Sequence, residues 1–422
     1  MAHNPLDAGK SNEQLLAERG KRLQDALELR QPDRIPLNMP AGYLLADYGG
    51  ITHQELLFNT AKAQELLEKF ALEFEPDTLL GLFNSPGPSL ALGDRMTRWP
   101  GVQLPANNSF QFDEHEFMKG EDYDAFLRDP SDWTFRTYLP RAFKELEGLQ
   151  YLPPLGMFAF GHYNLGNLPM LAAPPVAAAV QALSKAIQAA QQDGANMGAS
   201  VGRMVALGFP PTPLAGSLTE APFDFMSDTL RGMRGIMLDM LRRPEKLLAA
   251  ERVVLDLQLE FAISFAKATG LKAAFIPLHR GSDGFMSLPQ FEKFYWPQLK
   301  EQMVTLVDNG ITPVVFYEGI WNQRLKYLTE LPKGKTVGWF QDSDIFKVKE
   351  VVGDTMCIMG GMKNSLLNSG TVEQVRAFTK QVCEVVGKGG GFIMCTGVGE
   401  MEGSRLELVR AWVDATREFG VY

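Results

Sequence analysis

The second half of the chain alternates short apolar runs with longer segments in which apolar residues recur every three or four positions. The apolar runs lie at 273–279, 312–319, 335–342, 355–362 and 391–397. Short continuous apolar runs are typical of strands buried on both faces, and the longer segments are typical of helices that cover a sheet. This half therefore predicts parallel strands joined by helices.

The first half adds three more apolar runs, at 34–40, 78–84 and 205–216. Eight strands that alternate with helices is the number found in a closed (β/α)8 barrel, the TIM barrel. A doubly wound open sheet is the competing arrangement. It normally carries a glycine-rich phosphate loop or a switch point in strand order, and neither is recognisable in the sequence. We therefore predict an α/β fold of the (β/α)8 TIM barrel type.

The interval between the second and third predicted strands is too long for a plain barrel. Residues 85–204 contain loop-like stretches, a short helix and turn at "GEDYDAFLRDPSDW", and a long predicted helix over 175–198. No proline-, serine- or glycine-rich linker separates this interval from the rest of the chain. We predict that residues 1–422 form a single barrel domain with an inserted, N-terminal helical elaboration at about 85–204.

Composition and charge exclude several classes of partner. Of the 422 residues, 45% are hydrophobic and 22% are charged, and the net charge is −9, so no basic stripe is available for nucleic acid. No apolar run is long enough to span a bilayer, and the start, "MAHNPLDAGKSNEQ", lacks the order of a signal peptide. Three sparse cysteines, Cys357, Cys383 and Cys395, favour a reducing compartment. We expect a cytoplasmic protein that binds neither nucleic acid nor a membrane.

Polar side chains follow the predicted strands at the points where they end. In a barrel these strand ends meet at one face, where catalytic sites form. The side chains delivered there are His279, Arg280, Asp283, Tyr317, Glu318, Gln341, Asp342, Met362, Asn364, Cys395 and Glu400, with Asn84 and either Asn38 or Tyr43 from the first half.

Three of these side chains make a candidate metal site. His279, Glu318 and Cys395 offer one nitrogen, one oxygen and one sulfur ligand, and three ligands with an open fourth position are typical of catalytic zinc. Structural alternatives remain for each. A histidine can be a hydrogen-bonded core residue and a cysteine a small buried apolar one. Glu318 can cap the next helix or pair with Arg324, and Asp342 can cap the helix that follows it.

Four segments carry a resemblance that extends over nearly the whole chain. They are "GSLTEAPFDFMSDTLRGMRGIMLDMLRRPEKL", "LPQFEKFYWPQLKEQ", "GGM" with "LLNSGTVEQV", and "DYDAFLRDP". In the same order, these segments are similar to four motifs of one superfamily. The first two are a G-x-x-T-x-P segment with the helix after it, and an S-P-x-x-F-x-x-F-x-x-P helix. The last two are a late GG-x-D…L-x-x-G-T-x-E-x-V stretch and a phrase common in the superfamily's methyltransferase-like branch. The chain thus resembles the uroporphyrinogen decarboxylase superfamily, in its corrinoid-dependent methyltransferase-like branch. The resemblance implies a barrel that forms a homodimer, and it specifies function weakly.

Two departures from the superfamily's motifs bear on function. The decarboxylases carry "M-R-Q-A-G-R-Y", whose arginines hold the substrate's carboxylates, whereas this chain has "MPAGYLLADY" at 39–48. The zinc-thiol methyltransferases carry "H-x-C-G" and a later Cys. Here the aligned stretch is "FYEG", so Phe316 replaces the His and Glu318 the first Cys, while Cys395 matches the second. His279 as the missing nitrogen ligand is our inference. A carboxylate ligand suits a metal that polarises an oxygen leaving group.

These observations predict a methyltransferase that moves a methyl group from a small methylated substrate, with O-methyl favoured, to a corrinoid (cobalamin). The cobalamin would be carried by a separate corrinoid protein, and zinc on His279, Glu318 and Cys395 would activate the leaving group. The remaining assignments are Tyr317, Asp342 and Asp283 as catalytic groups and Asn84, Arg280 and Gln341 as substrate-binding groups.

Two alternatives remain open. The first is a decarboxylase or other lyase that acts on a small carboxylic acid or tetrapyrrole-like substrate. It would use Arg280 as the carboxylate anchor and Asp283 or Asp342 as the acid–base group. The second is a non-catalytic barrel that only binds a corrinoid or tetrapyrrole, although the density of polar residues at strand ends favours an enzyme.

Overall fold

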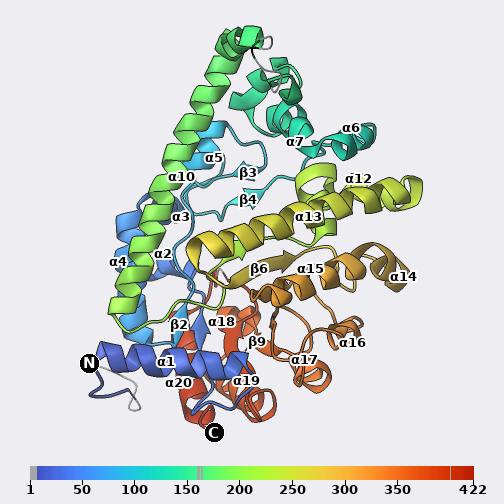
Figure 1. Cartoon of the computed structure of the whole chain (residues 1–422). Helices are drawn as coiled ribbons and strands as arrows, with labels where there is room; N and C mark the ends of the chain where they lie inside the picture. Colours follow the sequence, from blue (N-terminus) through green and yellow to red (C-terminus); the bar gives the residue numbers. More distant parts are fainter. Residues whose placement is uncertain (1–6, 159–161, 163–164, 400) are drawn as a thin grey trace. The chain divides into compact units, whose positions relative to one another are not determined.

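The chain divides into two compact units (Figure 1). The structure is a computed structural model that describes residues 7–158, 162, 165–399 and 401–422. Unit 1 comprises the described residues of Met1–Phe83, Met197–Ala221 and Leu255–Tyr422, and unit 2 those of Asn84–Asn196 and Pro222–Val254. Unit 2 thus overlaps the predicted elaboration and also includes residues 222–254.

Unit 1 is built on a six-stranded sheet with the order β10-β9-β8-β7-β6-β5, in which every pairing is parallel. The strands are β5 (Ser217–Leu218), β6 (Ala273–Leu278), β7 (Thr312–Tyr317), β8 (Val337–Phe340), β9 (Cys357–Met362) and β10 (Phe392–Thr396). The five strands predicted in the second half are confirmed. The helices between them cover one face of the sheet, with α15 on β7 and both α17 and α19 on β9.

The third predicted strand was misplaced. The helix α10 (Pro174–Ala206) continues past the predicted end of the long helix, and β5 begins only at Ser217. The stretch between them contains Pro210, Pro211 and Pro213, which have no backbone N–H to donate to a sheet. The apolar composition of 205–216 therefore marked a helix end and a proline-rich connection instead of a strand.

The first two predicted strands form a separate parallel pair, β1 (Asn38–Met39) with β2 (Thr78–Leu79). A single bridge between Leu37 and Met394 joins this pair to β10. No pairing between β2 and β5 occurs in the described part of the chain, so the predicted closed ring of eight strands is observed as a six-stranded sheet with an attached pair.

A buried carboxylate fixes the pairing of β1 with β2. Asp77, directly before β2, accepts hydrogen bonds from the Arg34 guanidinium at 2.8 Å and from the Leu37 backbone N–H at 2.8 Å. Burial alone raises the pKa of this carboxyl, but Arg34 and Arg22 outweigh it and hold the pKa below its ordinary value. Asp77 and its two arginines therefore lie at the edge of the sheet where the strands begin, and they anchor β1 and β2 there.

Short and long helices surround these strands in unit 1. They are α1 (Asn12–Leu27), α2 (Leu44–Gly49), α3 (His53–Phe58), α4 (Thr60–Phe74), α14 (Leu288–Gln290), η6 (Phe291–Tyr295), α15 (Trp296–Asp308), α16 (Leu325–Leu328), α17 (Ile345–Val352), α18 (Asn364–Ser369), α19 (Val372–Val385) and α20 (Leu406–Phe419). The helix α13 (Pro244–Thr269), like α10, has residues in both units.

Unit 2 is mainly helical and has its own core. Its elements are α5 (Gly87–Leu92), β3 (Thr97–Arg98), β4 (Gln111–Phe112), α6 (Tyr123–Arg128), α7 (Pro130–Trp133), η1 (Thr134–Tyr138), α8 (Leu139–Ala142), η2 (Lys144–Tyr151), η3 (Leu155–Phe158), η4 (Leu165–Ala172), α11 (Pro222–Asp224), η5 (Phe225–Arg231) and α12 (Gly232–Arg242). Leu146 and Leu149 pack against Val176 and Ala179 of α10. The buried Asp239 carboxylate accepts from the Tyr123 hydroxyl at 2.9 Å and from Arg231 at 2.6 Å, which ties α6 to α12.

No single helix of the described chain is long and apolar enough to cross a membrane. The elements η4 and α10 reach the length and apolar composition of a membrane span only when taken together, and they are bent by 74° where they meet.

Candidate functional site

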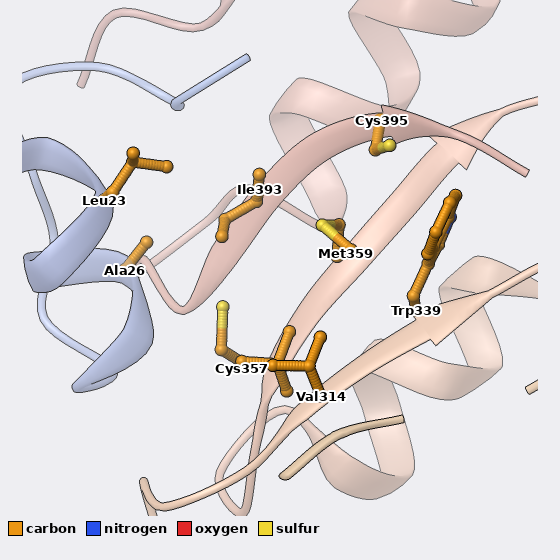
Figure 2. Close-up of a cluster of buried hydrophobic side chains, with 9 residues drawn as sticks. Leu23, Ala26, Val314, Trp339, Cys357, Met359, Ile393 and Cys395 are labelled. Carbon is orange, nitrogen blue, oxygen red and sulfur yellow. The ribbon is translucent and has the colours of Figure 1, made fainter. Parts of the chain in front are cut away.

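The face of the sheet opposite to α15, α17 and α19, here called the inner face, carries an apolar cluster. Its strand residues are Val314, Val337, Trp339, Cys357, Met359, Ile393 and Cys395, and α1 adds Leu23 and Ala26 (Figure 2). Phe275 and Phe316 pack against the cluster and are only partly buried. Successive side chains on a strand point to opposite faces, so the residues two positions further along each strand also belong to the inner face.

The strand register brings the predicted site residues into one row across this face. Leu278 pairs with Tyr317 and Tyr317 with Phe340, so the residues that follow them, His279, Glu318 and Gln341, are neighbours. Gly361 pairs with Cys395, and the bridge between Leu37 and Met394 places Asn38 beside Cys395. We call this set the strand-end row: His279, Glu318, Gln341, Gly361, Cys395 and Asn38.

The first part of the strand-end row is polar and accessible. An imidazole nitrogen of His279, Nε2, lies 3.5 Å from Glu318 Oε2, and the two side chains are 33% and 46% exposed. Gln341 Oε1 accepts a hydrogen bond from the Gly319 backbone N–H at 2.6 Å. Gly319 has a φ of +72°, a conformation that favours glycine, so the turn after β7 holds Glu318 and Gln341 side by side.

The last part of the row is buried. Cys395 is fully buried beside Trp339 and Met359 (Figure 2). Asn38 Nδ2 lies 3.7 Å from the Cys395 sulfur and 3.4 Å from the Met359 sulfur. Burial raises the pKa of the Cys395 thiol to about 12, although hydrogen bonds from Thr396 and Asn38 oppose the shift. The thiol is therefore protonated at neutral pH.

The three predicted zinc ligands do not form a three-ligand set in this arrangement. Two strands, β8 and β9, separate Glu318 from Cys395 in the register. Within the described ranges no group of three His, Cys, Asp or Glu side chains could hold a metal ion. Zinc on His279, Glu318 and Cys395 stays a prediction, and no step of the chemistry below depends on it.

Asp283 has a structural contact that the sequence did not indicate. Its carboxylate accepts from the Arg324 guanidinium at 2.6 Å and from the Gln323 backbone N–H at 3.0 Å. Arg324 therefore does not pair with Glu318, which instead faces His279. Arg280 lies over the Phe285 ring, 5.4 Å from its centroid. The segment "HRGSDG" thus combines one residue of the strand-end row with a turn held by an ion pair.

Tyr317 lies on the outer face and not in the strand-end row. Its ring stacks on Phe340 with centroids 4.6 Å apart and meets Trp321 edge-on at 5.0 Å. It is fully buried, its hydroxyl has no hydrogen-bond partner among the described residues, and burial raises its pKa. The sequence analysis placed Tyr317 and Glu318 in the site together, but consecutive side chains of a strand point to opposite faces, so only one of the two can lie on the inner face.

The cap prediction for Asp342 was also wrong. The N-cap of α17 is Asp344, whose carboxylate accepts from the backbone N–H of Phe346 at 3.0 Å. Asp342 is exposed, and its backbone N–H donates to the Gly319 carbonyl at 3.3 Å. Asp342 therefore adds to the turn contacts around Glu318 through its backbone.

The remaining predicted residues lie elsewhere. Asn84 is the first residue of unit 2, and Glu400 lies outside the described residues. Tyr43 is buried and stacks on His53, with centroids 4.3 Å apart. The sequence analysis missed two apolar residues, Leu218 and Phe275, which share the inner face with His279. Phe275 could have been found from the sequence by counting back from His279 in steps of two.

Comparisons with known proteins agree with this architecture. Residues 159–419 match the family described as Uroporphyrinogen decarboxylase (URO-D). The chain belongs to the URO-D family. A solved structure described as a methyltransferase from Methanosarcina mazei is similar in fold, with a TM-score of 0.57, 17% sequence identity, and coverage of 95% of this chain and 98% of that one. No curated protein matches the sequence.

Proposed function

We propose that this URO-D family enzyme is a methyltransferase that takes a methyl group from a small O-methyl compound and gives it to a reduced corrinoid. The observation that carries the proposal is the His279–Glu318 pair, 3.5 Å apart and partly exposed at the end of neighbouring parallel strands. Such strand ends are where barrel enzymes place their reacting groups. The likeness in fold to a methyltransferase over nearly the whole of both chains supports the same reading.

We infer that the eight strands make the (β/α)8 barrel of the family. The order β2-β1-β10-β9-β8-β7-β6-β5, obtained by joining the pair to the sheet through the Leu37–Met394 bridge, is the order of a barrel opened between β2 and β5. Thr78 Oγ1 donates to the Pro210 carbonyl at 2.8 Å, so β2 and the segment that leads to β5 are already in contact.

The chemistry assigned to the pair is proton transfer to the leaving oxygen. When the methyl group departs, the bond between the methyl carbon and oxygen breaks and its electron pair stays on oxygen. The protonated His279 imidazole gives a proton to that oxygen, so the product is a neutral alcohol or phenol. Glu318 stabilises the protonated imidazole, and we assign Gln341, the neighbour of Glu318 in the strand-end row, to hydrogen-bond the same oxygen. A reduced corrinoid, presented by a separate corrinoid protein, would supply the nucleophile that accepts the methyl group.

The inner face does not suit the polycarboxylate after which the family is named. Within the strands β5 to β10, no inner position carries Lys or Arg, and Lys363, one residue past β9, is exposed with its ammonium 5.4 Å from the centroid of the Phe378 ring. A carboxylate-rich substrate needs such cations, because removing an anion from water without a partner is costly. Decarboxylation of a small acid is the alternative that the family membership keeps open.

Methyl transfer can be distinguished from decarboxylation in one assay. Purified enzyme is mixed with chemically reduced cobalamin and ¹³C-methyl-labelled methanol or anisole, and ¹³C-methylcobalamin is measured by NMR. We expect transfer in the wild type and in His115→Asn, a matched control in unit 2, and a loss of about a hundredfold or more in His279→Asn. Release of carbon dioxide from small carboxylic acids without any corrinoid, and no methyl transfer, would contradict the proposal.

A further inference from the structure

The inner face differs in burial between its two halves: β8 to β10 bury their inner side chains, whereas β5 to β7 leave theirs partly accessible. On β8, β9 and β10 the inner residues Trp339, Met359 and Cys395 are at most 3% exposed. On β6 the inner residues are less buried than the outer ones. The outer residues Ile276 and Leu278 are buried, whereas the inner residues Phe275, Pro277 and His279 are only partly buried.

The neighbouring strands continue this pattern. On β7 the inner Phe316 is partly buried while the outer Val315 and Tyr317 are fully buried. On β5 the inner residue Leu218, which pairs with Phe275, is 59% exposed. We call Leu218, Phe275, Pro277 and Phe316 the apolar inner patch. Apolar side chains that stay accessible beside polar reacting groups are typical of ligand sites.

We propose that the apolar inner patch binds the aromatic ring of the methyl donor, so that the substrate is an uncharged aryl methyl ether. This inference rests on the function proposed above and specifies its substrate class. The patch and the His279–Glu318 pair share the inner face of β6 and β7. On β6, His279 lies two positions beyond Pro277 and four beyond Phe275. On β7, Glu318 lies two positions beyond Phe316. A ring on the patch therefore places its ether oxygen at the pair.

The geometry of the rings favours an aromatic occupant over an aliphatic one. Trp339 borders the patch, with its ring centroid 4.6 Å from that of Phe316 at 46° and 6.4 Å from that of Phe275 at 40°. Its indole N–H donates to the Thr396 carbonyl at 2.8 Å, which fixes the ring (Figure 2 shows its place beside Met359). Tilted rings at these separations attract a further ring through edge-to-face contacts.

Charge favours a neutral donor. Within the strands β5 to β10, the inner positions carry no ionisable group apart from the buried thiols Cys357 and Cys395. The positions that continue the alternation past the strand ends add Glu220, His279, Glu318 and Lys363, and the Lys363 ammonium lies over the Phe378 ring of α19, 5.4 Å from its centroid. A carboxylated ring would place its negative charge near Glu318, where it would compete with that carboxylate for the protonated His279 imidazole.

Equilibrium binding without any corrinoid tests the inference separately from methyl transfer. Titration calorimetry and ligand-observed NMR are run with anisole, methoxycyclohexane and methanol. We expect anisole to bind roughly threefold or more tightly than methoxycyclohexane and at least about tenfold more tightly than methanol. Phe316→Leu should abolish the preference for the aromatic ring, and Leu218→Ser, at a position exposed enough to spare folding, should weaken anisole binding by about threefold.

Phe58→Leu is the matched control, because Phe58 is exposed on α3 and away from the sheet. Equal binding of the two rings, or anisole binding that neither variant changes, would overturn the inference. Variant-dependent anisole binding without methyl transfer in the assay above would contradict the proposed function only. Methyl transfer from methanol without anisole binding would contradict the substrate class only.

Discussion

The two halves of the inner face share one sheet and one register but differ in how much space their side chains fill. On the β8–β10 half, Trp339, Met359, Ile393 and Cys395 close the interior, and the thiol stays protonated. On the β5–β7 half, Leu218, Phe275 and Phe316 leave it accessible beside His279 and Glu318. Side-chain volume, and not position at a strand end, therefore decides which half can meet a substrate.

The largest effect is expected from the polar pair on the accessible half. Glu318→Gln and His279→Asn should each lower the rate of methyl transfer by about 10² to 10⁴-fold, because each removes the supported proton donor. The double variant should lose little more than either single one, since the two groups act as a unit. Rates from the methylcobalamin assay check this. Glu65→Gln, on the surface of α4, is the matched control, and additive losses would mean that the pair does not act together.

Core truncation should separate the halves in stability. Met359→Ala should lower the free energy of unfolding by about 2 to 5 kcal/mol, because it leaves a cavity in the filled half. Leu218→Ala should change it by less than about 0.5 kcal/mol, because that side chain is already largely exposed. Urea unfolding followed by far-ultraviolet circular dichroism measures both. Similar losses in the two variants would show that the β5–β7 half is packed after all.

Alkaline pH should affect the filled half through its thiol. The pKa of Cys395 is raised to about 12 in the folded protein, whereas the unfolded chain loses that proton near 9.0. The stability linked to this proton is present below pH 9 and is lost as the pH rises towards 12, at about 1.4 kcal/mol per pH unit. Unfolding measured at several pH values above 9 should show a shallower decline for Cys395→Ala. Equal slopes in the two proteins would mean that the thiol is not desolvated.

The smallest effect is expected on the outer face. Tyr317→Phe removes a buried hydroxyl that has no partner in the described chain, so unfolding stability should change by less than about 1 kcal/mol. The methyl transfer rate should stay within about twofold of the wild type, since the hydroxyl does not face the strand-end row. A kinetic comparison under saturating donor decides this. A large loss of rate would place Tyr317 in the reaction and contradict the assignment of the two faces.

Much of the fold could be predicted because its signal is local. Parallel strands buried on both faces read as apolar runs, and all five in the second half occur at the expected places. The run at 205–216 failed because composition alone does not separate a helix end with three following prolines from a strand. The closed ring could not be established from local patterns, because a pairing of β2 with β5 would depend on tertiary contacts, and none occurs in the described part of the chain.

The candidate site was predicted in part. His279 and Glu318 are neighbours because adjacent parallel strands end at the same edge, a relation that the sequence already contained. Tyr317 and Glu318 were treated alike, although consecutive residues face opposite sides of a strand. Cys395 lies in the same row, but its burial depends on the volumes of Trp339 and Met359 from other strands, which no spacing of residues reveals.

The most direct test of the central claim is the rate of methyl transfer by Cys395→Ala, measured beside the wild type with ¹³C-methyl anisole and reduced cobalamin. The account places the reaction on the β5–β7 half, so it predicts a rate within about threefold of the wild type once the variant is shown to be folded. A loss of about a hundredfold or more in a folded variant would place the thiol among the reacting groups and contradict the division of the inner face.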